Sequence, residues 1–156
     1  MRISISSDTA EAVARSLVVP LRERGYEVVI HGAPRPGDDP QWAVCSAVAA
    51  RDVAEGHADQ VVVCGWTGTG ASIAANKVPG VRAALCTDAC TADGARRRND
   101  ADVPALGLRL TFEPLLKEIL DALFAAAPSE DAEDRENVAR AGRLDLRRGD
   151  EAGDRP

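Results

Sequence analysis

The chain has 156 residues, of which 45% are hydrophobic and 28% are charged, a composition typical of one soluble globular domain with a sizeable core. Its formal net charge of −6 argues against nucleic acid or an anionic membrane as the main partner. No apolar run is long enough to span a bilayer, and the opening MRISISSD lacks the apolar core of a signal peptide, so we expect a cytoplasmic protein.

Short β-branched runs alternate along the chain with segments whose apolar residues recur at helical spacing. In the first such segment Leu17, Val18 and Leu21 share one face. Pro20 predicts a kink there, and Gly25 marks the end of the helix. Strands are expected at residues 2–6, 27–30, 61–63, 81–86 and 103–108, and helices at 11–24, 41–55, from 71 onward, 91–99 and 113–126.

This alternation predicts an α/β fold, in which a five-stranded parallel sheet is covered by helices on both faces. Ligands of such sheets bind beyond the carboxyl ends of the strands. Asp8, the 65–70 loop, Asp88 and Asn99 lie after strands or in the helices that follow them. We therefore expect these residues to meet at one crevice.

The composition changes at Pro128, where the chain becomes charged and mostly polar. Residues 1–127 are expected to form the α/β domain. Residues 128–142 are expected to form a helical extension with too few apolar side chains to stand alone, which either packs on another subunit or frays. Residues 143–156 have the composition of a disordered tail.

The sequence from Gly65 to Gly70, GWTGTG, lies between an apolar β-branched run and the start of a helix. A glycine-rich loop in this position directs backbone N–H groups at an anion, such as an enediolate or a phosphate. Its spacing matches neither the P-loop nor the dinucleotide-binding fingerprint. The alternative interpretation is a tight turn between strand and helix that binds no ligand.

The cysteines do not have the spacing of a metal site. Cys45, Cys64, Cys86 and Cys90 form no C-x-x-C pair, and the chain has only two histidines. We expect free thiols, no metal and no cofactor.

The stretch TGTGASIAANKVPGVRAALC, residues 67–86, resembles the ribose-5-phosphate isomerase B family, which includes the galactose-6-phosphate isomerase subunits. Asp38–Asp39–Pro40 and Asn99–Asp100–Ala101 add to the resemblance. The resemblance implies a Rossmann-like three-layer fold and a homodimer or tetramer with active sites shared between subunits. It also implies interconversion of an aldose phosphate and a ketose phosphate through a cis-enediolate, with no metal.

The sequence departs from the family at the expected catalytic positions. Where most members carry the cysteine base this chain has Gly65, and Cys64 lies one residue earlier. Where a second branch carries a glutamate this chain has Ala71. The two usual histidines are replaced by Thr9 and Arg98.

Two residues remain as candidate bases. Cys64 would reach the substrate if the strand end bulges, whereas regular alternation turns its thiol to the other face as a small buried hydrophobe. Asp8 is the alternative base, since a partly dry crevice raises the pKa of a carboxylate, but it is equally suited to capping the first helix.

The remaining candidates would contact substrate. Trp66 would stack on a sugar or cover a hydrophobic gap. Arg98 would bind a phosphate or carboxylate, or remain a solvated charge in its Arg-Arg-Arg run. Asn99 would bind substrate or cap a helix. The resemblance implies that Arg109 reaches a phosphate, and Arg135 is a nearest match to a C-terminal phosphate-binding arginine. The predicted site thus has Cys64, Asp8 and Thr67 as catalytic residues and Thr9, Gly65, Trp66, Gly68, Thr69, Gly70, Arg98, Asn99, Arg109 and Arg135 as substrate contacts.

The favoured hypothesis is a sugar-phosphate aldose–ketose isomerase with an altered substrate range. Loss of the ring-opening histidine would suit a substrate that does not cyclise well, such as a four-carbon sugar phosphate. One alternative is a catalytically silent sugar-phosphate-binding homologue, or a partner subunit of a hetero-oligomeric isomerase. Another is an isomerase of a non-phosphorylated or acidic sugar, with a carboxylate held by Arg98.

Overall fold

The computed structural model describes the backbone of residues 1–10 and 14–152, and the side chains of residues 1–10 and 16–145. Five parallel strands form one sheet in the order β2-β1-β3-β5-β4. The strands are β1 (Arg2–Ser7), β2 (Glu27–Gly32), β3 (Gln60–Gly65), β4 (Ala83–Leu85) and β5 (Val103–Gly107). The helices are a π-helical turn η1 (Ala14–Val18), α1 (Val19–Glu23), α2 (Trp42–Ala54), α3 (Thr69–Ala75), α4 (Ala89–Asn99), α5 (Glu113–Ala125) and α6 (Ala132–Ala152).

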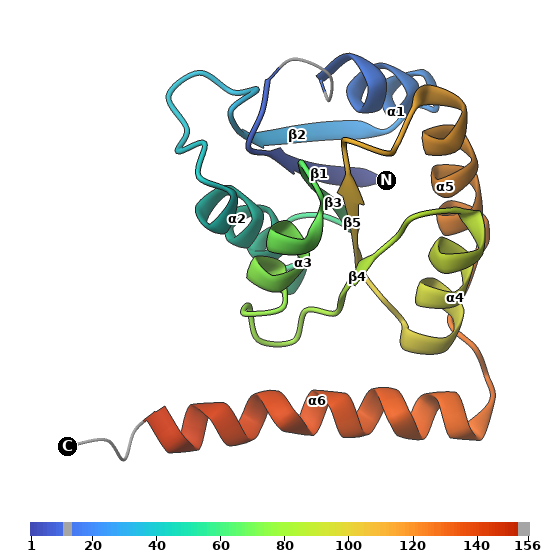
Figure 1. Cartoon of the computed structure of the whole chain (residues 1–156). Coiled ribbons are helices and arrows are strands. Elements are labelled where there is room, and N and C mark those ends of the chain that lie inside the picture. Colours follow the sequence, from blue (N-terminus) through green and yellow to red (C-terminus); the bar gives the residue numbers. More distant parts are fainter. Residues whose placement is uncertain (11–13, 153–156) are drawn as a thin grey trace.

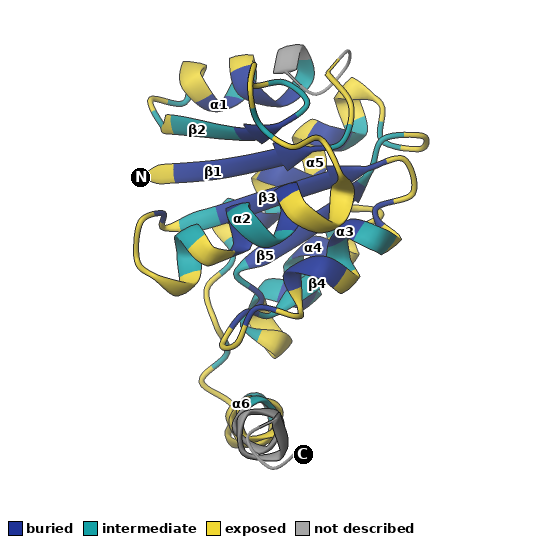
Figure 2. Ribbon diagram, turned by 90° about the vertical axis from the view of Figure 1, so that its left-hand side faces the viewer, coloured by how far each residue is buried: buried dark blue, intermediate teal, exposed yellow. Residues whose placement is uncertain are grey.

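Helices cover both faces of the sheet, which confirms the three-layer α/β fold expected from the sequence. Figure 1 shows α2 and α3 on one side of the strands and α1, α4 and α5 on the other. Strand alternation supplies each layer with its own apolar residues. Figure 2 shows the strands as the most buried part of the chain and α6 as largely exposed.

The two cores differ in the size of their side chains. Between the sheet and α1, α4 and α5, the buried residues include Ile5, Leu106 and Ile119. Between the sheet and α2 and α3, the buried residues are alanine and valine alone, including Ala71 and Ala75 of α3. Small side chains let α3 lie close to the sheet, and this fixes the loop that leads into it.

Several elements differ in their bounds from the sequence-based expectation. Pro20 lies in the first turn of α1, directly after η1, where its missing N–H breaks no bond of a regular helix. Residues 11–13 of the expected first helix lie outside the described residues. β4 begins at Ala83 rather than at residue 81, because the backbone N–H of Arg82 donates to Asp102 Oδ1 at 3.0 Å instead of joining the ladder.

Helix α6 extends from Ala132 to Ala152, past the end expected near residue 142. Residues 153–156 of the expected tail lie outside the described residues. Figure 1 shows α6 crossing below the other elements, joined to them through the segment that follows α5. Asp145 Oδ2 accepts a hydrogen bond from the N–H of Gly80 at 2.9 Å, which ties the helix to the body. Its packing on another subunit stays a prediction. In the described part of the chain, no helix has the length and apolar character needed to cross a membrane.

Candidate functional site

Three segments meet at the carboxyl edge of the sheet. Asp8 follows β1, the 65–70 loop follows β3, and Arg109 follows β5. These strands are adjacent and parallel, so their carboxyl ends lie side by side. We call this group of three segments the carboxyl-edge site.

Glycines bring the 65–70 loop into close contact with its neighbours. Gly68 has a positive φ of 75°, and a Cβ atom there would lie 2.7 Å from Leu85 Cδ1 and 2.8 Å from the backbone carbon of Leu106. A Cβ atom on Gly107 would lie 2.9 Å from the carbonyl oxygen of Thr67. The loop can therefore adopt this path only if both positions lack a side chain.

The loop keeps polar groups available at its tip. The hydroxyls of Thr67 and Thr69 hydrogen-bond to each other at 2.7 Å at the exposed surface of the loop. Among the described residues, the backbone N–H groups of Thr67 and Gly68 donate to no backbone carbonyl. Both N–H groups are thus left without a backbone acceptor, as an anion-binding loop requires; Thr67 is exposed and Gly68 is buried.

The Asp8 carboxylate faces the start of this loop. A Cβ atom on Gly65 would lie 3.7 Å from Asp8 Oδ2 and 3.9 Å from Asp8 Oδ1. Oδ1 is buried and has no hydrogen-bond partner among the described groups. A carboxylate oxygen in that state is a strong acceptor, because leaving it unpaired is costly. The neighbouring Thr9 is exposed, and its N–H donates to Ser7 Oγ at 3.1 Å.

Cys64 is fully buried, with 0% of its surface exposed. Its strand is regular, since Cys64 pairs with Ser7 on one side and with Leu106 on the other without a bulge. The thiol lies in the same core as Ile5. Burial raises the pKa of this thiol above its ordinary value of 9.0, and the nearby Asp8 raises it further. This placement matches the second of the two interpretations, the small buried hydrophobe.

We expect thiol reagents to separate these cysteines. Cys90 is exposed, whereas Cys45, Cys64 and Cys86 are buried, and burial raises the pKa of Cys86 to about 11. Only the thiolate reacts quickly, so the folded protein should bind one equivalent of Ellman's reagent rapidly and the other three after unfolding. A Cys90→Ser variant should lose the rapid phase. Rapid labelling of Cys64 in the folded protein, located by peptide mapping, would contradict this placement.

Two tryptophans flank the 65–70 loop. Trp66 is 60% exposed, and the guanidinium carbon of Arg109 lies 6.0 Å from the centroid of its ring. The N–H of Arg109 donates to the carbonyl of Trp66 at 3.1 Å. Trp42 packs on the other end, since a Cβ atom on Gly70 would lie 3.1 Å from two carbons of its indole. The Trp66 indole therefore does not fill the loop.

The other predicted substrate contacts lie at the opposite edge. Helix α4 starts after β4 and runs back to the amino end of β5, so Arg98 and Asn99 lie at the amino edge of the sheet. Arg98 and Arg135 line one cavity of about 210 Å³ between α4 and α6. The expectation that Asn99 meets Asp8 in one crevice is therefore wrong within a single chain. The C-cap of α4 is Asp100 rather than Asn99.

Asp88 lies at the carboxyl edge, but its carboxylate is already in use. Its side chain accepts a hydrogen bond from the N–H of Thr91 at 2.7 Å, and the Thr91 hydroxyl accepts one from the N–H of Asp88 at 3.0 Å. These bonds form a capping box at the start of α4. The bonds from Thr91 hold the pKa of Asp88 below its ordinary value.

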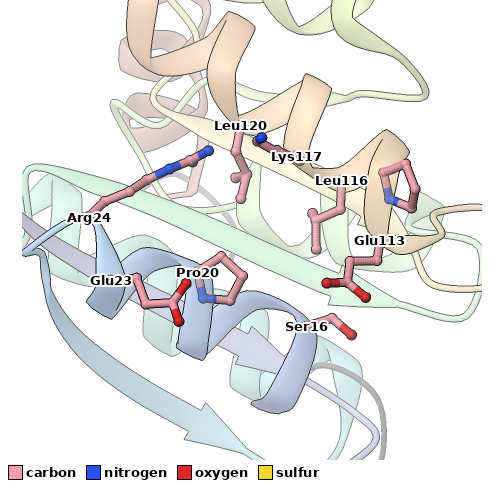
Figure 3. A pocket seen from close by; sticks show the side chains of 9 residues that line it. Ser16, Pro20, Glu23, Arg24, Glu113, Leu116, Lys117 and Leu120 are labelled. Carbon is pink, nitrogen blue, oxygen red and sulfur yellow. The ribbon is translucent and has the colours of Figure 1, made fainter.

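A cavity of about 550 Å³ lies elsewhere, between α1 and α5. Figure 3 shows Pro20, Leu116 and Leu120 between charged side chains of both signs. Arg24 on its rim pairs with Asp121. Opposite charges along the cavity cancel, so it has no preference for an anion, and it contains none of the predicted site residues. No group of three or more His, Cys, Asp or Glu in the described chain is arranged to hold a metal ion.

Residues 3–141 match the sequence model of the family described as Ribose/Galactose Isomerase. The chain belongs to this family. It is 35% identical over 124 residues to D-erythrulose-4-phosphate isomerase of Pectobacterium atrosepticum, a match covering 78% of this chain and 81% of that protein. It is 40% identical over 114 residues to ribose-5-phosphate isomerase B of Escherichia coli, covering 70% and 73% of the two chains. A third relative is the galactose-6-phosphate isomerase subunit LacB of Clostridium acetobutylicum, 37% identical over 119 residues, with 76% and 68% covered.

Solved structures agree with this assignment. Ribose-5-phosphate isomerase B of Clostridium thermocellum superposes with a TM-score of 0.86 at 33% identity, covering 94% of this chain and 99% of that one. The ribose/galactose isomerase family and the isomerase class expected from residues 67–86 are therefore confirmed.

Sequence reasoning missed the network that holds the amino-edge residues of this isomerase fold. Arg82 Nε donates to the carbonyl of Asp100 at 2.7 Å, and Nη2 lies 3.0 Å from Asp100 Oδ2 and 3.2 Å from Asp102 Oδ2. Asp100 has a φ of +45°, a strained value for a residue with a side chain. We used Asn99–Asp100–Ala101 only as part of the family resemblance and assigned no ion pair to Asp100 or Asp102.

Proposed function

We propose that this chain is a sugar-phosphate aldose–ketose isomerase of the ribose-5-phosphate isomerase B type, with Asp8 as its base. The main support is the position of the Asp8 carboxylate. It faces Gly65, the residue that stands where the resemblance places the catalytic cysteine, and a side chain at Gly65 would begin 3.7 Å from Asp8 Oδ2. A carboxylate approaching from β1 can thus replace a thiol lost from β3.

The reaction needs a proton moved between two neighbouring carbons. Asp8 would take the proton from the carbon next to the carbonyl, and the electron pair of that C–H bond would form the C=C bond of a cis-enediolate. The carbonyl oxygen would become an oxyanion held by the N–H groups of Thr67 and Gly68. The proton of the neighbouring hydroxyl would pass to this oxyanion, so that the negative charge moves to the second oxygen. Asp8 would then return its proton to the former carbonyl carbon, the electron pair of the C=C bond would form the new C–H bond, and the deprotonated hydroxyl oxygen would become the new carbonyl.

The residues around Asp8 suit an open-chain substrate. The two positions where the family carries histidines are Thr9 and Arg98, and neither residue type is among the usual general acids and bases. Ring opening therefore has no obvious acid or base. The relative named D-erythrulose-4-phosphate isomerase supports an enzyme whose substrate needs no ring opening.

We also propose that two copies of the chain complete each site. Arg98, Asn99 and Arg135 lie at the amino edge, away from Asp8 in the same chain. Meanwhile Leu110 and Phe112, which follow Arg109, are 70% and 64% exposed. Large exposed apolar side chains beside an incomplete site favour a second copy, assembled as a homodimer or tetramer.

The second candidate function is a silent binding protein or a partner subunit of a hetero-oligomeric isomerase. The displaced Cys64 favours it, and so does the relative that is named a subunit.

Turnover by the purified chain separates the two functions. The protein should be incubated alone with D-erythrulose 4-phosphate, ribose 5-phosphate and galactose 6-phosphate, and conversion followed by proton NMR. We expect conversion of at least one compound, with uptake of solvent deuterium at the exchanged carbon. Binding of these compounds without conversion or exchange would instead support the silent homologue.

A mixing experiment tests the shared site. Asp8→Asn and Asn99→Ala variants should each be nearly inactive, because each damages every site of a homodimer. When the two variants are co-expressed and pair at random, half of the dimers contain one chain of each kind. In such a mixed dimer one of the two sites carries neither substitution, so about a quarter of wild-type activity should return. If each site belonged to one chain, mixing would restore nothing.

A further inference from the structure

The Trp66 and Arg109 side chains form a stacked pair beside the predicted base. The guanidinium carbon lies 6.0 Å from the indole centroid, within the range of a cation–π contact. The main chain fixes both partners, because the N–H of Arg109 donates to Trp66 O at 3.1 Å and the N–H of Leu108 donates to Gly65 O at 3.0 Å. The pair is therefore part of the rigid end of the sheet.

The guanidinium of this pair is available to an anion. No carboxylate in the described chain forms an ion pair with Arg109, although many of its other arginines are paired with one. Stacking occupies the face of a guanidinium and leaves the N–H groups along its edge free. A phosphate oxygen arriving at the carboxyl edge would meet this edge.

The pair is anchored one residue from the position that Asp8 faces. Asp8 faces Gly65, Trp66 is the next residue, and consecutive Cα atoms are about 3.8 Å apart. An arginine side chain alone is flexible and would reach phosphates at many distances. The contact with the indole reduces the range of positions open to the guanidinium, and the backbone keeps the pair on the same edge of the sheet as Asp8.

We propose that the Trp66–Arg109 pair limits the substrate to short sugar phosphates, of four carbons, by setting the distance between the phosphate and the carbon that Asp8 deprotonates. Trp66 is then the specificity-determining residue, although it takes no part in proton transfer. This inference rests on the proposed function. In a four-carbon substrate the phosphate can contact Arg109 while the reacting carbon contacts Asp8. One more carbon moves either the phosphate or the reacting carbon out of place.

The expected discrimination follows from the size of one carbon. One extra carbon in a fitted site typically changes kcat/KM by about 10–200-fold. Replacing Trp66 by glycine frees the Arg109 side chain to move outward and opens the space of the indole. The variant should therefore lose activity on the four-carbon substrate and gain it on the five-carbon substrate.

The test compares kcat/KM for D-erythrulose 4-phosphate and ribose 5-phosphate in wild-type, Trp66→Gly, Trp66→Phe and Val19→Ala proteins. Val19 is 50% exposed on α1, outside the carboxyl-edge site and outside the proposed contact with a second copy, so its variant is a control for lost apolar surface. Trp66→Gly should move the five-carbon to four-carbon ratio at least tenfold toward ribose 5-phosphate. Trp66→Phe keeps an aromatic face and Val19→Ala leaves the pair intact, so both should keep the wild-type ratio within about threefold.

Two results would overturn the inference. One is a ratio in Trp66→Gly within twofold of wild type, in a protein that still turns over either substrate. The other is an equal shift in Val19→Ala, which would assign the effect to loss of exposed apolar surface in general. Absence of turnover by every protein on both substrates would instead refute the isomerase function itself, and circular dichroism of each variant identifies loss of folding.

Discussion

Replacing Asp8 with asparagine is expected to lower kcat by about 10²–10⁴-fold, the range typical for loss of a general base. Asparagine has nearly the same size as aspartate but accepts no proton near neutral pH. Its amide still fits against Gly65, because the carboxylate oxygens lie 3.7 and 3.9 Å from the point that a Cβ atom on Gly65 would occupy. KM should therefore change little, because the loop and Arg109 still bind the substrate.

The Asp8→Asn effect should be compared with that of Cys64→Ala. The Cys64 thiol is fully buried, and burial keeps it protonated by raising its pKa. We expect Cys64→Ala to keep kcat within about threefold at temperatures where it stays folded, since removing a small buried group affects stability before activity. The two variants should be compared by initial rates and by exchange of the substrate C–H with solvent deuterium.

The opposite pattern would change the mechanism. Full activity in Asp8→Asn together with loss in Cys64→Ala would mean that the end of β3 rearranges to bring the thiol to the substrate.

The expected pattern has its own signature. Loss of C–H exchange in Asp8→Asn, with substrate binding retained by calorimetry, would assign the proton transfer to the carboxylate. Equal thermal unfolding of Asp8→Asn and wild type excludes a folding defect as the cause.

The order of the helices and strands could be predicted from the sequence. Along the α/β domain, the spacing of apolar residues and the glycines that end the elements indicate the same boundaries. The sequence was insufficient for α6. The sequence beyond Gly142 has few apolar residues, and we interpreted it as a disordered tail. The structure continues the helix to Ala152, and Asp145 in this continuation accepts a hydrogen bond from the N–H of Gly80 at 2.9 Å. A contact between residues so far apart in the chain leaves no local signal in the sequence.

The candidate site was predictable only where a strand leads straight into it. Asp8 and Trp66 directly follow strands and Arg109 lies two residues after one, and the structure brings all three to one edge. Asn99 was misplaced because a helix that follows a parallel strand runs back along the sheet, so its last residue returns to the amino edge. This return of the helix could have been inferred from the sequence. It places some of the predicted substrate contacts at the carboxyl edge of the sheet and the others at the amino edge.

The contact between Asp8 and Gly65 could not be predicted from the sequence. It depends on the register that pairs Ser7 with Cys64, and single residues give no direct signal for register between parallel strands. Once that register is set, the residue after Ser7 lies beside the residue after Cys64. The same register keeps the Cys64 thiol in the core.

Gly68→Ala is expected to lower the free energy of unfolding by about 2–4 kcal/mol, which combines a positive φ with overpacking. The new methyl group would lie 2.7 Å from Leu85 Cδ1 and 2.9 Å from the backbone nitrogen of Gly107. The leucine tip can move, but the strand backbone at Leu106 and Gly107 cannot. The loop must shift instead, so its N–H groups lose their alignment and kcat should fall as well.

Gly80→Ala is the matched control, because Gly80 has a φ of +81° and open space where its side chain would be. Gly80→Ala should lower the free energy of unfolding by about 1 kcal/mol, the cost of placing a side chain at a positive φ without any steric clash. Urea unfolding followed by circular dichroism gives both differences on one scale. Equal losses in the two variants would show that strand contacts at Gly68 add nothing. A larger loss in Gly68→Ala, with reduced kcat in the remaining folded protein, would mean that close packing under the loop is what holds its N–H groups toward the substrate.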